Sequence, residues 1–469
     1  MLIVPGRPSQ RGLTWWVDAP PALPAVAVVP STTAQSVRVL DLGQIRGEPG
    51  NGPCLVCAAG LEPDNRYELR IGNSSGWSRT LPAALDRLPA PFGVALGSCF
   101  YGDKDPAAAG FYQPRINNLY DVGLRFLCGD QLYMDLQGHV TMWKILKQVV
   151  LPHAPDAWAR YREHWHVDYY ARFLTQSPTL LLGDDHDFWN DFPHRKAWIP
   201  WGDPDPASDI RRTLDRAYST YQAALNVDPE AGANVGSLAE LERLLNDSAR
   251  SFSFRVPPLE FFVLDVRTHR TTHDALPRRL CDEVHLQTAE RWLAGLQGPG
   301  VLVLSQPLVV HAASWFENAV PVAKGDWNLP DYPEHFGRLC DALFTAPHDV
   351  MVLTGDIHWS RLYQLDQPRG GTVYEVVSSP LCLITGQSPP SLKRTKSTGK
   401  LEWRSTTGVG RKVDWKRLAA PTPESATYAT ARFSSLPGGV RADIEFWGRR
   451  GGTVTQPRRQ LKADPITLH

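Results

Sequence analysis

The stretch TLLLGDDHDFWNDF, residues 179–192, passes from an apolar run directly into polar side chains. After one glycine the polar residues are Asp184, Asp185, His186, Asp187, Asn190 and Asp191. Carboxylates this close repel one another, and near a core they also lose hydration that must be replaced. Either a bound hard cation replaces it, or the residues lie on a solvated loop. The rest of the sequence decides between these two readings.

Composition describes an ordinary globular protein without an obvious polyanionic partner. The 469 residues indicate about two to three domains. The 49 basic and 49 acidic residues cancel, so the net charge favours neither nucleic acid nor a membrane surface as a partner. Gly and Pro together with 16 Trp favour a loop-rich enzyme over a helical bundle. The sequence leaves the oligomeric state open.

The cysteines and the N-terminal sequence indicate in which cellular compartment the protein is expected. Seven cysteines are scattered, and Cys54 and Cys57 form a CxxC without a second pair, which argues against a zinc knuckle and a disulfide framework. The first residues, MLIVPGRPSQRGLTWW, show no basic start followed by an apolar segment and no twin-arginine pair. No run reaches the ~18–20 apolar residues of a membrane span. We therefore expect a cytoplasmic protein.

Two patterns divide the chain. Residues 1–88 contain short β-type runs at 25–29, 36–42, 54–59 and 66–72, separated by Pro, Gly and Asn, which is typical of a small sandwich. From residue 93 onward, apolar strands alternate with helical patterns at 156–174, 281–296 and 333–344, which indicates a layered α/β domain.

Polar residues follow many of these strands. The strand ends carry Ser98 and Cys99, Asp130 and Tyr133, the 184–187 stretch, Asp265 and Arg267, Gln306, and Asp356 and His358. In such sheets functional loops gather at the carboxyl ends of the strands. A shared polar site is therefore favoured over unrelated solvated loops.

Four motifs occur in order: GSC (97–99), GDQLY (129–133), DDHDFWN (184–190) and GDIH (355–358). One Gly-Asp pair alone usually marks a plain turn. Together the motifs resemble the PhoD-like phosphatases, a branch of the calcineurin-like metallophosphatases. The segments FFVLDVRTHR (261–270) and DWNLPDYPEH (326–335) resemble further parts of that family, and the resemblance covers most of residues 1–380.

The resemblance implies a fold class: an α/β, four-layer metallophosphatase sandwich of two packed sheets flanked by helices, preceded by a small β-sandwich domain. The expected divisions are 1–88 for a fibronectin-III-like sandwich, 93–385 for the catalytic domain, 386–427 for a basic loop or lid, and 428–469 for strands completing the catalytic domain. The segment 386–427 holds nine Lys and Arg residues, and a solvated excursion is favoured over a lid that attracts anionic substrate.

The resemblance also implies metal ligands. One metal ion, typically ferric iron (Fe³⁺), would be held by Cys99, Asp130, Tyr133 and His358. Asp130 would bridge to a harder site, calcium (Ca²⁺) in some members, completed by Asp185, Asn190 and Asp356. Mn²⁺, Zn²⁺ or Mg²⁺ are alternatives. Thiolate and phenolate suit a transition metal, whereas carboxylate and amide oxygens suit a hard ion.

Three residues carry open alternatives. His186 would lie beside the phosphate as a ligand or a general acid, with Asp185 as its catalytic neighbour. Cys99 stands where the wider superfamily has an Asp-x-His motif; it is either the PhoD-type ligand or a small buried thiol. Arg267 either binds the substrate phosphate or forms a structural ion pair, and the structural reading is favoured.

These features predict a metallophosphatase that hydrolyses small-molecule phosphate esters, as a phosphomonoesterase or phosphodiesterase, using several metal ions to activate water. One alternative is a catalytically inactive, metal-holding binding protein on the same fold. Another is a hydrolase of a different ester or anhydride. Specificity is expected to lie in the loops at 100–118, 191–250 and 386–427.

Overall fold

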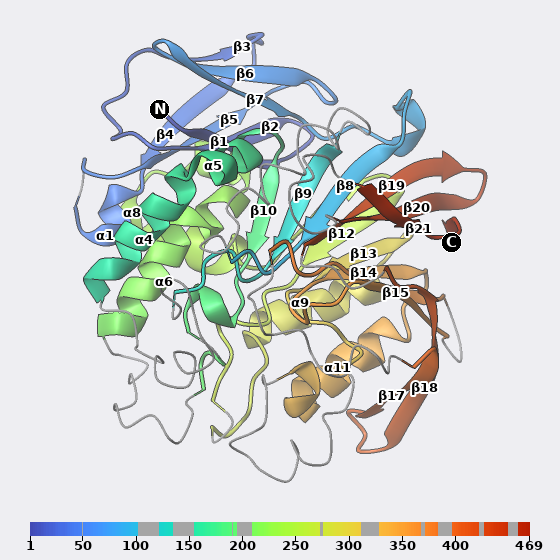
Figure 1. Ribbon diagram of the computed structural model, residues 1–469. Coiled ribbons are helices and arrows are strands. Elements are labelled where there is room, and N and C mark those ends of the chain that lie inside the picture. Colours follow the sequence, from blue (N-terminus) through green and yellow to red (C-terminus); the bar gives the residue numbers. More distant parts are fainter. Residues whose placement is uncertain are drawn as a thin grey trace.

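The computed structural model describes residues 1–48, 50–101, 122–134, 154–189, 191–194, 209–272, 275–310, 328–366, 371–382, 396–421, 426–448 and 458–469. Figure 1 shows the N-terminal strands packed above a larger body, in which central sheets lie between two groups of helices. Within the described ranges, no helix is both long enough and apolar enough to cross a membrane.

The N-terminal region is a small antiparallel domain of two facing sheets, as expected. One sheet has the order β1 (Ile3–Pro8), β2 (Gly12–Val17), β5 (Cys54–Ala59), β4 (Ser36–Asp41). The other has the order β3 (Val26–Val29), β6 (Arg66–Ile71), β7 (Ser74–Arg79). Trp15 and Val56 from the first sheet share one core with Tyr67 and Leu69 from the second. The short helix α1 (Gly43–Arg46) follows β4.

The first large sheet begins with three parallel strands. Its order is β10 (Thr179–Leu182), β9 (Val122–Cys128), β8 (Phe92–Gly97), β19 (Thr427–Leu436), β20 (Gly439–Gly448), β21 (Arg458–Lys462), and β22 (Ile466–Leu468) also pairs with β20. β19 pairs with β8 along its length, so the C-terminal strands extend the sheet rather than only closing its edge. The sheet therefore joins segments from both ends of the catalytic region.

The second large sheet carries a parallel centre and an antiparallel end. Its order is β11 (Phe252–Val256), β12 (Leu259–Val263), β13 (Gly300–Val303), β14 (Val350–Thr354), β16 (Val373–Val377), β15 (Arg361–Leu365), β18 (Gly410–Ala419), β17 (Thr398–Arg404). Strands β12, β13, β14 and β16 run parallel, so their carboxyl ends share one edge.

Alternating side chains explain the four layers. Leu180 and Leu182 of β10 join Met351 and Leu353 of β14 in the core between the sheets, whereas Leu181 faces the opposite way, into the core of the first helical layer. That layer consists of α4 (Ala154–His166), α5 (Asp168–Thr175), α6 (Asp209–Tyr221), η3 (Ala223–Asn226), α7 (Pro229–Ala233), α8 (Leu238–Arg243) and η4 (Leu244–Ser248). On the other side α9 (Glu283–Ala294) and α11 (Pro333–Leu343) cover the second sheet. Strands buried on both faces need apolar residues at every position, which matches the observed runs.

Two expectations differ from the structure. The helical pattern at 156–174 is split at Val167, whose backbone is not helical. The described part of the basic segment, 396–421, is not a solvated loop or lid but the β17–β18 hairpin at the edge of the second sheet. Its apolar residues alternate with Lys and Arg, and Trp403 and Trp415 pack into the core beside α11 while the charged residues point outward. Residues 386–395 and 422–425 lie outside the described ranges.

Candidate metal centre

The candidate ligands follow the carboxyl ends of strands from both sheets. Cys99 follows β8, Asp130 follows β9, and Asp185 with His186 forms part of the short helix η2 (Asp185–Asp187) after β10. Asp356 follows β14 of the other sheet. The sheets thus bring together Cys99 and Asp356, which are 257 positions apart in the chain.

Four residues on three of these loops adopt a backbone conformation that is rare outside glycine. Cys99, Asp130, Asp356 and His358 have φ values of 58°, 55°, 70° and 51°. A non-glycine residue held there costs about 1–3 kcal/mol, and such residues cluster at functional sites. Contacts with the surrounding structure must therefore hold the backbone of these residues in the strained conformation.

The glycines of the two Gly-Asp motifs have steric reasons. Gly129 has φ 88°, and a Cβ there would lie 2.4 Å from Cβ of Asp184. A Cβ on Gly355 would lie 2.3 Å from Cβ of Ser98. Because both glycines lack a Cβ atom, the backbone of one ligand loop can approach the next loop closely.

A thiol and a phenol lie against one carboxylate oxygen, and an imidazole contacts the phenol. The Sγ atom of Cys99 lies 3.5 Å from Oδ2 of Asp130, and the hydroxyl of Tyr133 lies 3.5 Å from the same oxygen. That hydroxyl is also 3.5 Å from Nε2 of His358. The hydroxyl of Ser379 donates to the Cys99 sulfur at 3.2 Å. Cys99 is thus part of a polar cluster rather than an isolated core thiol.

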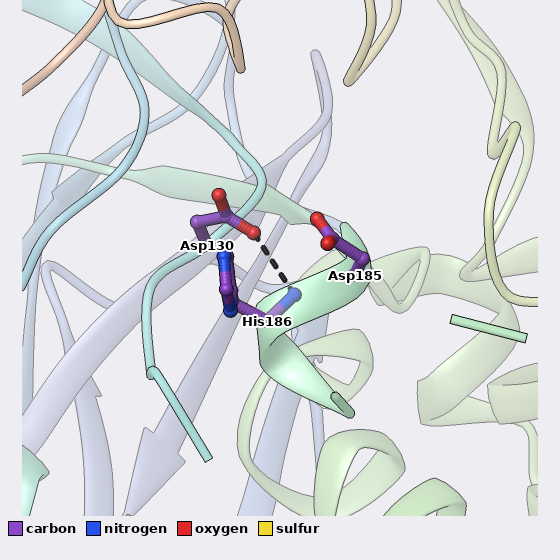
Figure 2. Close-up of side chains that lie close together, drawn as sticks. All are labelled: Asp130, Asp185 and His186. Carbon is purple, nitrogen blue, oxygen red and sulfur yellow. Dashed lines mark hydrogen bonds between the residues drawn. The ribbon is translucent and has the colours of Figure 1, made fainter. Parts of the chain in front are cut away.

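Carboxylates make up the other half of the centre. Ligand atoms of Asp184, Asp185 and Asp356 lie within 4.8 Å of one another, and so do those of Asp130, Asp185 and His186. Figure 2 shows the second group, with Asp130 on the loop after β9 facing the turn that carries Asp185 and His186. The backbone N–H of His186 donates to Oδ1 of Asp130 at 3.2 Å, so the two oxygens of Asp130 serve different neighbours. Asp130 therefore lies between the two halves.

Burial makes the charged forms of these groups costly without a cation. Burial, followed by repulsion from Asp185, raises the pKa of Asp130 well above its usual value. Burial, followed by repulsion from Asp184 and Asp185, does the same to the pKa of Asp356. The pKa of the Cys99 thiol is also raised by burial and then by Asp130 and Asp356. A divalent or trivalent cation would reverse these shifts because it favours deprotonated ligands.

The residues present fit a metal ion. Asp184 is fully buried, and within the described part of the chain its Oδ2 atom makes no hydrogen bond. A buried carboxylate oxygen left without a partner is expensive, and a cation would satisfy it. The donor set also matches: sulfur, phenol and imidazole on one side of Asp130, and carboxylates on the other.

Asp187 serves the site without the features of a ligand. Its carboxylate accepts backbone hydrogen bonds from Asp130, Gln131 and Leu132 at 3.0, 3.0 and 3.1 Å, and from Asp184 at 3.0 Å. We call these donors the N–H pocket of Asp187. Because the pocket ties the loop after β9 to the loop after β10, Asp187 fixes the spacing of two ligand-bearing loops.

Of the two remaining predicted residues, the structure describes Arg267. Arg267 is fully buried, forms an ion pair with Asp184 and donates to the Phe192 carbonyl at 2.8 Å, which corresponds to the structural reading. Asn190 lies outside the described residues.

Sequence reasoning did not assign four residues that contribute to the centre: Asp184, Asp187, Gln306 and Ser379. Gln306 donates to Oδ2 of Asp356 at 3.2 Å. Asp184 and Asp187 stood inside the quoted acidic stretch, but their contrasting roles depend on hydrogen bonds that the sequence does not show. Gln306 stood among the polar residues at the strand ends, but its contact with Asp356 depends on the tertiary structure.

No protein-family model and no curated protein matches the chain. Among solved structures, a structure of PhoD aligns with a TM-score of 0.60, covering 99% of this chain and 88% of that chain at 16% sequence identity. The mixed α/β layers and the small N-terminal antiparallel domain correspond to the fold that the sequence motifs implied, which is thereby confirmed. The chain therefore has the fold of the PhoD structure.

Proposed function

We propose that the protein is a metal-dependent hydrolase of phosphate esters of the PhoD-like group. The observation that carries this proposal is the convergence of Cys99, Asp130, Tyr133, Asp356 and His358 on one buried centre in a chain with the PhoD fold. The contact from Cys99 to the Asp356 backbone carbonyl, 3.3 Å, joins the two sheets at that point.

The two halves of the centre would hold different ions. Cys99, Tyr133 and His358 would hold a transition metal ion, with Fe³⁺ as our first choice. Asp184, Asp185 and Asp356 would hold a hard ion such as Ca²⁺, and Asp130 would contact both. Mn²⁺, Zn²⁺ and Mg²⁺ remain alternatives to be distinguished by analysis of the purified protein.

The chain's own groups support hydrolysis. When bound, the cations would neutralise the phosphoryl oxygens and lower the pKa of an attacking water molecule. His186 packs its ring 4.4 Å from that of Tyr133 and keeps 8% of its surface exposed, whereas Asp185 is fully enclosed. As the less enclosed of the two groups, the imidazole would be the one to contact a substrate oxygen and transfer a proton to the leaving group. The enclosed carboxylates would hold the cations away from bulk water.

Metal analysis followed by assay tests this function. The purified protein should contain at least one transition metal ion, and it should hydrolyse a panel of phosphomonoesters and phosphodiesters after the recovered metals are restored. Asp356→Asn should lower both metal content and activity. Asp282 caps the N-terminus of α9, where it accepts from the Val284 N–H at 2.8 Å, so Asp282→Asn should change neither. A wild-type protein that binds no metal and cleaves no phosphoester would refute the proposal.

Colour provides a test of the Fe³⁺ assignment. Tyr133 and Cys99 ligation to ferric iron would give a visible charge-transfer band, and Tyr133→Phe should shift or remove it. A colourless, iron-free and fully active enzyme would exclude Fe³⁺ in favour of the alternative metals.

We also propose that the protein works in a reducing compartment and uses an internal phosphoester. All seven cysteines are free and buried, which suits an environment without disulfide formation. Cell fractionation with sequencing of the native N-terminus tests this location. Activity in the periplasm or medium would contradict it.

A further inference from the structure

Gln222 lies outside the ligand set but contacts the Asp187 carboxylate, which also accepts from the N–H pocket. Its side chain is fully buried, and its Nε2 atom donates to Oδ1 of Asp187 at 2.8 Å and to the hydroxyl of Tyr161 at 3.0 Å. The opposite amide orientation would place a carbonyl oxygen against the carboxylate, so the donor orientation is strongly favoured. Gln222 therefore adds a side-chain hydrogen-bond donor to the backbone donors around the Asp187 carboxylate.

The Asp187 carboxylate connects Gln222 to two candidate metal ligands. The same Asp187 carboxylate binds the backbone N–H groups of Asp130 and Asp184. A rotation of the Asp187 carboxylate would therefore displace both loops, and with them the oxygens proposed to bind metal. Groups that orient metal ligands commonly change metal affinity about 10- to 100-fold when they are lost.

The neighbouring Asn226 holds the strand that precedes the acidic stretch. Its Oδ1 atom accepts from the Leu181 N–H at 3.0 Å, and its Nδ2 atom donates to the Leu181 carbonyl at 2.6 Å. Leu181 lies in β10, which ends two residues before Asp184. Asn226 thus acts as an edge partner for β10, in place of another strand.

The N-terminal sandwich anchors the segment 220–227, which contains both residues. Trp16 donates through Nε1 to the carbonyl of Thr220 at 2.9 Å, and Thr14 donates through its hydroxyl to the carbonyl of Val227 at 3.0 Å. At Gly6 the backbone approaches so closely that a Cβ would lie 2.5 Å from the Leu225 carbonyl oxygen. Carbonyls that this irregular segment cannot pair within itself are therefore satisfied by the other domain.

We propose that Gln222 and Asn226 are positioning residues for the metal centre, and that the N-terminal sandwich holds them in place through the segment 220–227. The inference rests on the proposed function, because it assumes that Asp130 and Asp184 belong to a metal site. It assigns the sandwich a role in metal affinity in addition to any role in stability.

Titration of the full-length, metal-stripped protein with Mn²⁺ alone, followed by electron paramagnetic resonance, tests this without an activity assay. Gln222→Leu should weaken Mn²⁺ binding about 10-fold or more. Ile444→Val, a buried change in β20, serves as a control that should leave Mn²⁺ affinity unchanged. The thermal midpoints of the metal-free variants separate a loss of positioning from a general loss of stability.

A matched tryptophan pair extends the test to the sandwich. Trp16→Phe removes the donor to Thr220 and should weaken Mn²⁺ binding about threefold, a smaller effect because Trp16 is more remote from the ligands. Trp15→Phe changes the adjacent buried indole, which faces the core of the sandwich instead, and should have no effect on Mn²⁺ affinity. Equal effects of the two substitutions would overturn the role of the sandwich.

The outcomes separate the two proposals. Wild-type protein that binds Mn²⁺ while Gln222→Leu binds it with unchanged affinity would overturn this inference and leave the proposed function standing. Wild-type protein that binds neither Mn²⁺ nor the other candidate metals would overturn both.

Discussion

Asp187 and Asp184 are three residues apart and both are fully buried, yet their surroundings differ in kind. Asp187 is surrounded by the N–H pocket and the amide of Gln222, which supply neutral donors from four backbone groups and one side chain. Asp184 pairs with Arg267 through Oδ1, and a carboxylate oxygen of Asp184 lies within 4.8 Å of those of Asp185 and Asp356.

In the proposed metal site, this difference separates a structural carboxylate from a candidate ligand. Donors preorganised by the backbone replace part of the lost hydration without any cofactor, so burial raises the pKa of Asp187 only to about 6. Burial, followed by repulsion from neighbouring carboxylates, raises the pKa of Asp356 and of Asp130 well above their usual values, and a bound cation would oppose both effects. Asp184 and Asp187 would therefore respond differently to a bound cation, although they are identical residues three positions apart.

The largest effect is expected from removing the carboxylate shared by both halves of the centre. Asp130→Asn should lower turnover at least ~10³-fold, which corresponds to several kcal/mol of transition-state stabilisation. Steady-state kinetics with saturating metal measures this loss. Retention of more than a tenth of the wild-type rate would show that Asp130 is not shared between the halves.

The next prediction concerns the N–H pocket. Asp187→Asn places an NH₂ group against backbone donors, so it should lower the free energy of unfolding of the metal-free protein by about 2–3 kcal/mol. Urea denaturation measures the change, and Asp356→Asn provides the comparison because it removes repulsion instead. If both substitutions destabilise the metal-free protein equally, the proposed contrast between the two regions fails.

A smaller effect should appear in the pH dependence. A carboxyl whose pKa is higher in the folded than in the unfolded chain contributes stability that is complete below the unfolded pKa of about 3.9 and is lost as pH rises through the folded pKa. Burial raises the pKa of Asp356 well above its usual value. The thermal midpoint of the metal-free wild type should therefore rise as the pH is lowered from neutrality. The corresponding rise for Asp356→Asn should be smaller.

Saturating Ca²⁺ should oppose this trend, because the cation binds the deprotonated carboxylates and stabilises the fold increasingly as pH rises. Glu402→Gln, on the outer face of the β17–β18 hairpin, is a control that should follow the wild type. Parallel curves for wild type and Asp356→Asn in the absence of metal would argue against strain in the acidic centre.

Much of the architecture was predictable because it depends on local patterns. Apolar runs such as 179–182 and 350–354 must be buried on both faces, and each was followed by the polar residues that the structure finds at strand ends. Order and spacing of the four motifs likewise indicated which fold these strands adopt. The strands β1 and β2 were missed, since Pro5 and Pro8 obscure the first of them and its partner lacks regular alternation.

By itself the sequence determined the layered α/β class, the N-terminal sandwich and the residue types of the centre, because hydrophobic periodicity and short motifs are encoded locally. Only the tertiary structure decided the role of each acidic residue in the centre. It gave Asp187 its N–H pocket, paired Arg267 with Asp184, turned the basic segment at 396–421 into a sheet edge, and set Gln222 beside the ligand loops. Those outcomes depend on contacts between positions far apart in the chain, where the free energy of a buried charge is fixed by the atoms that fold around it and not by its neighbours in sequence.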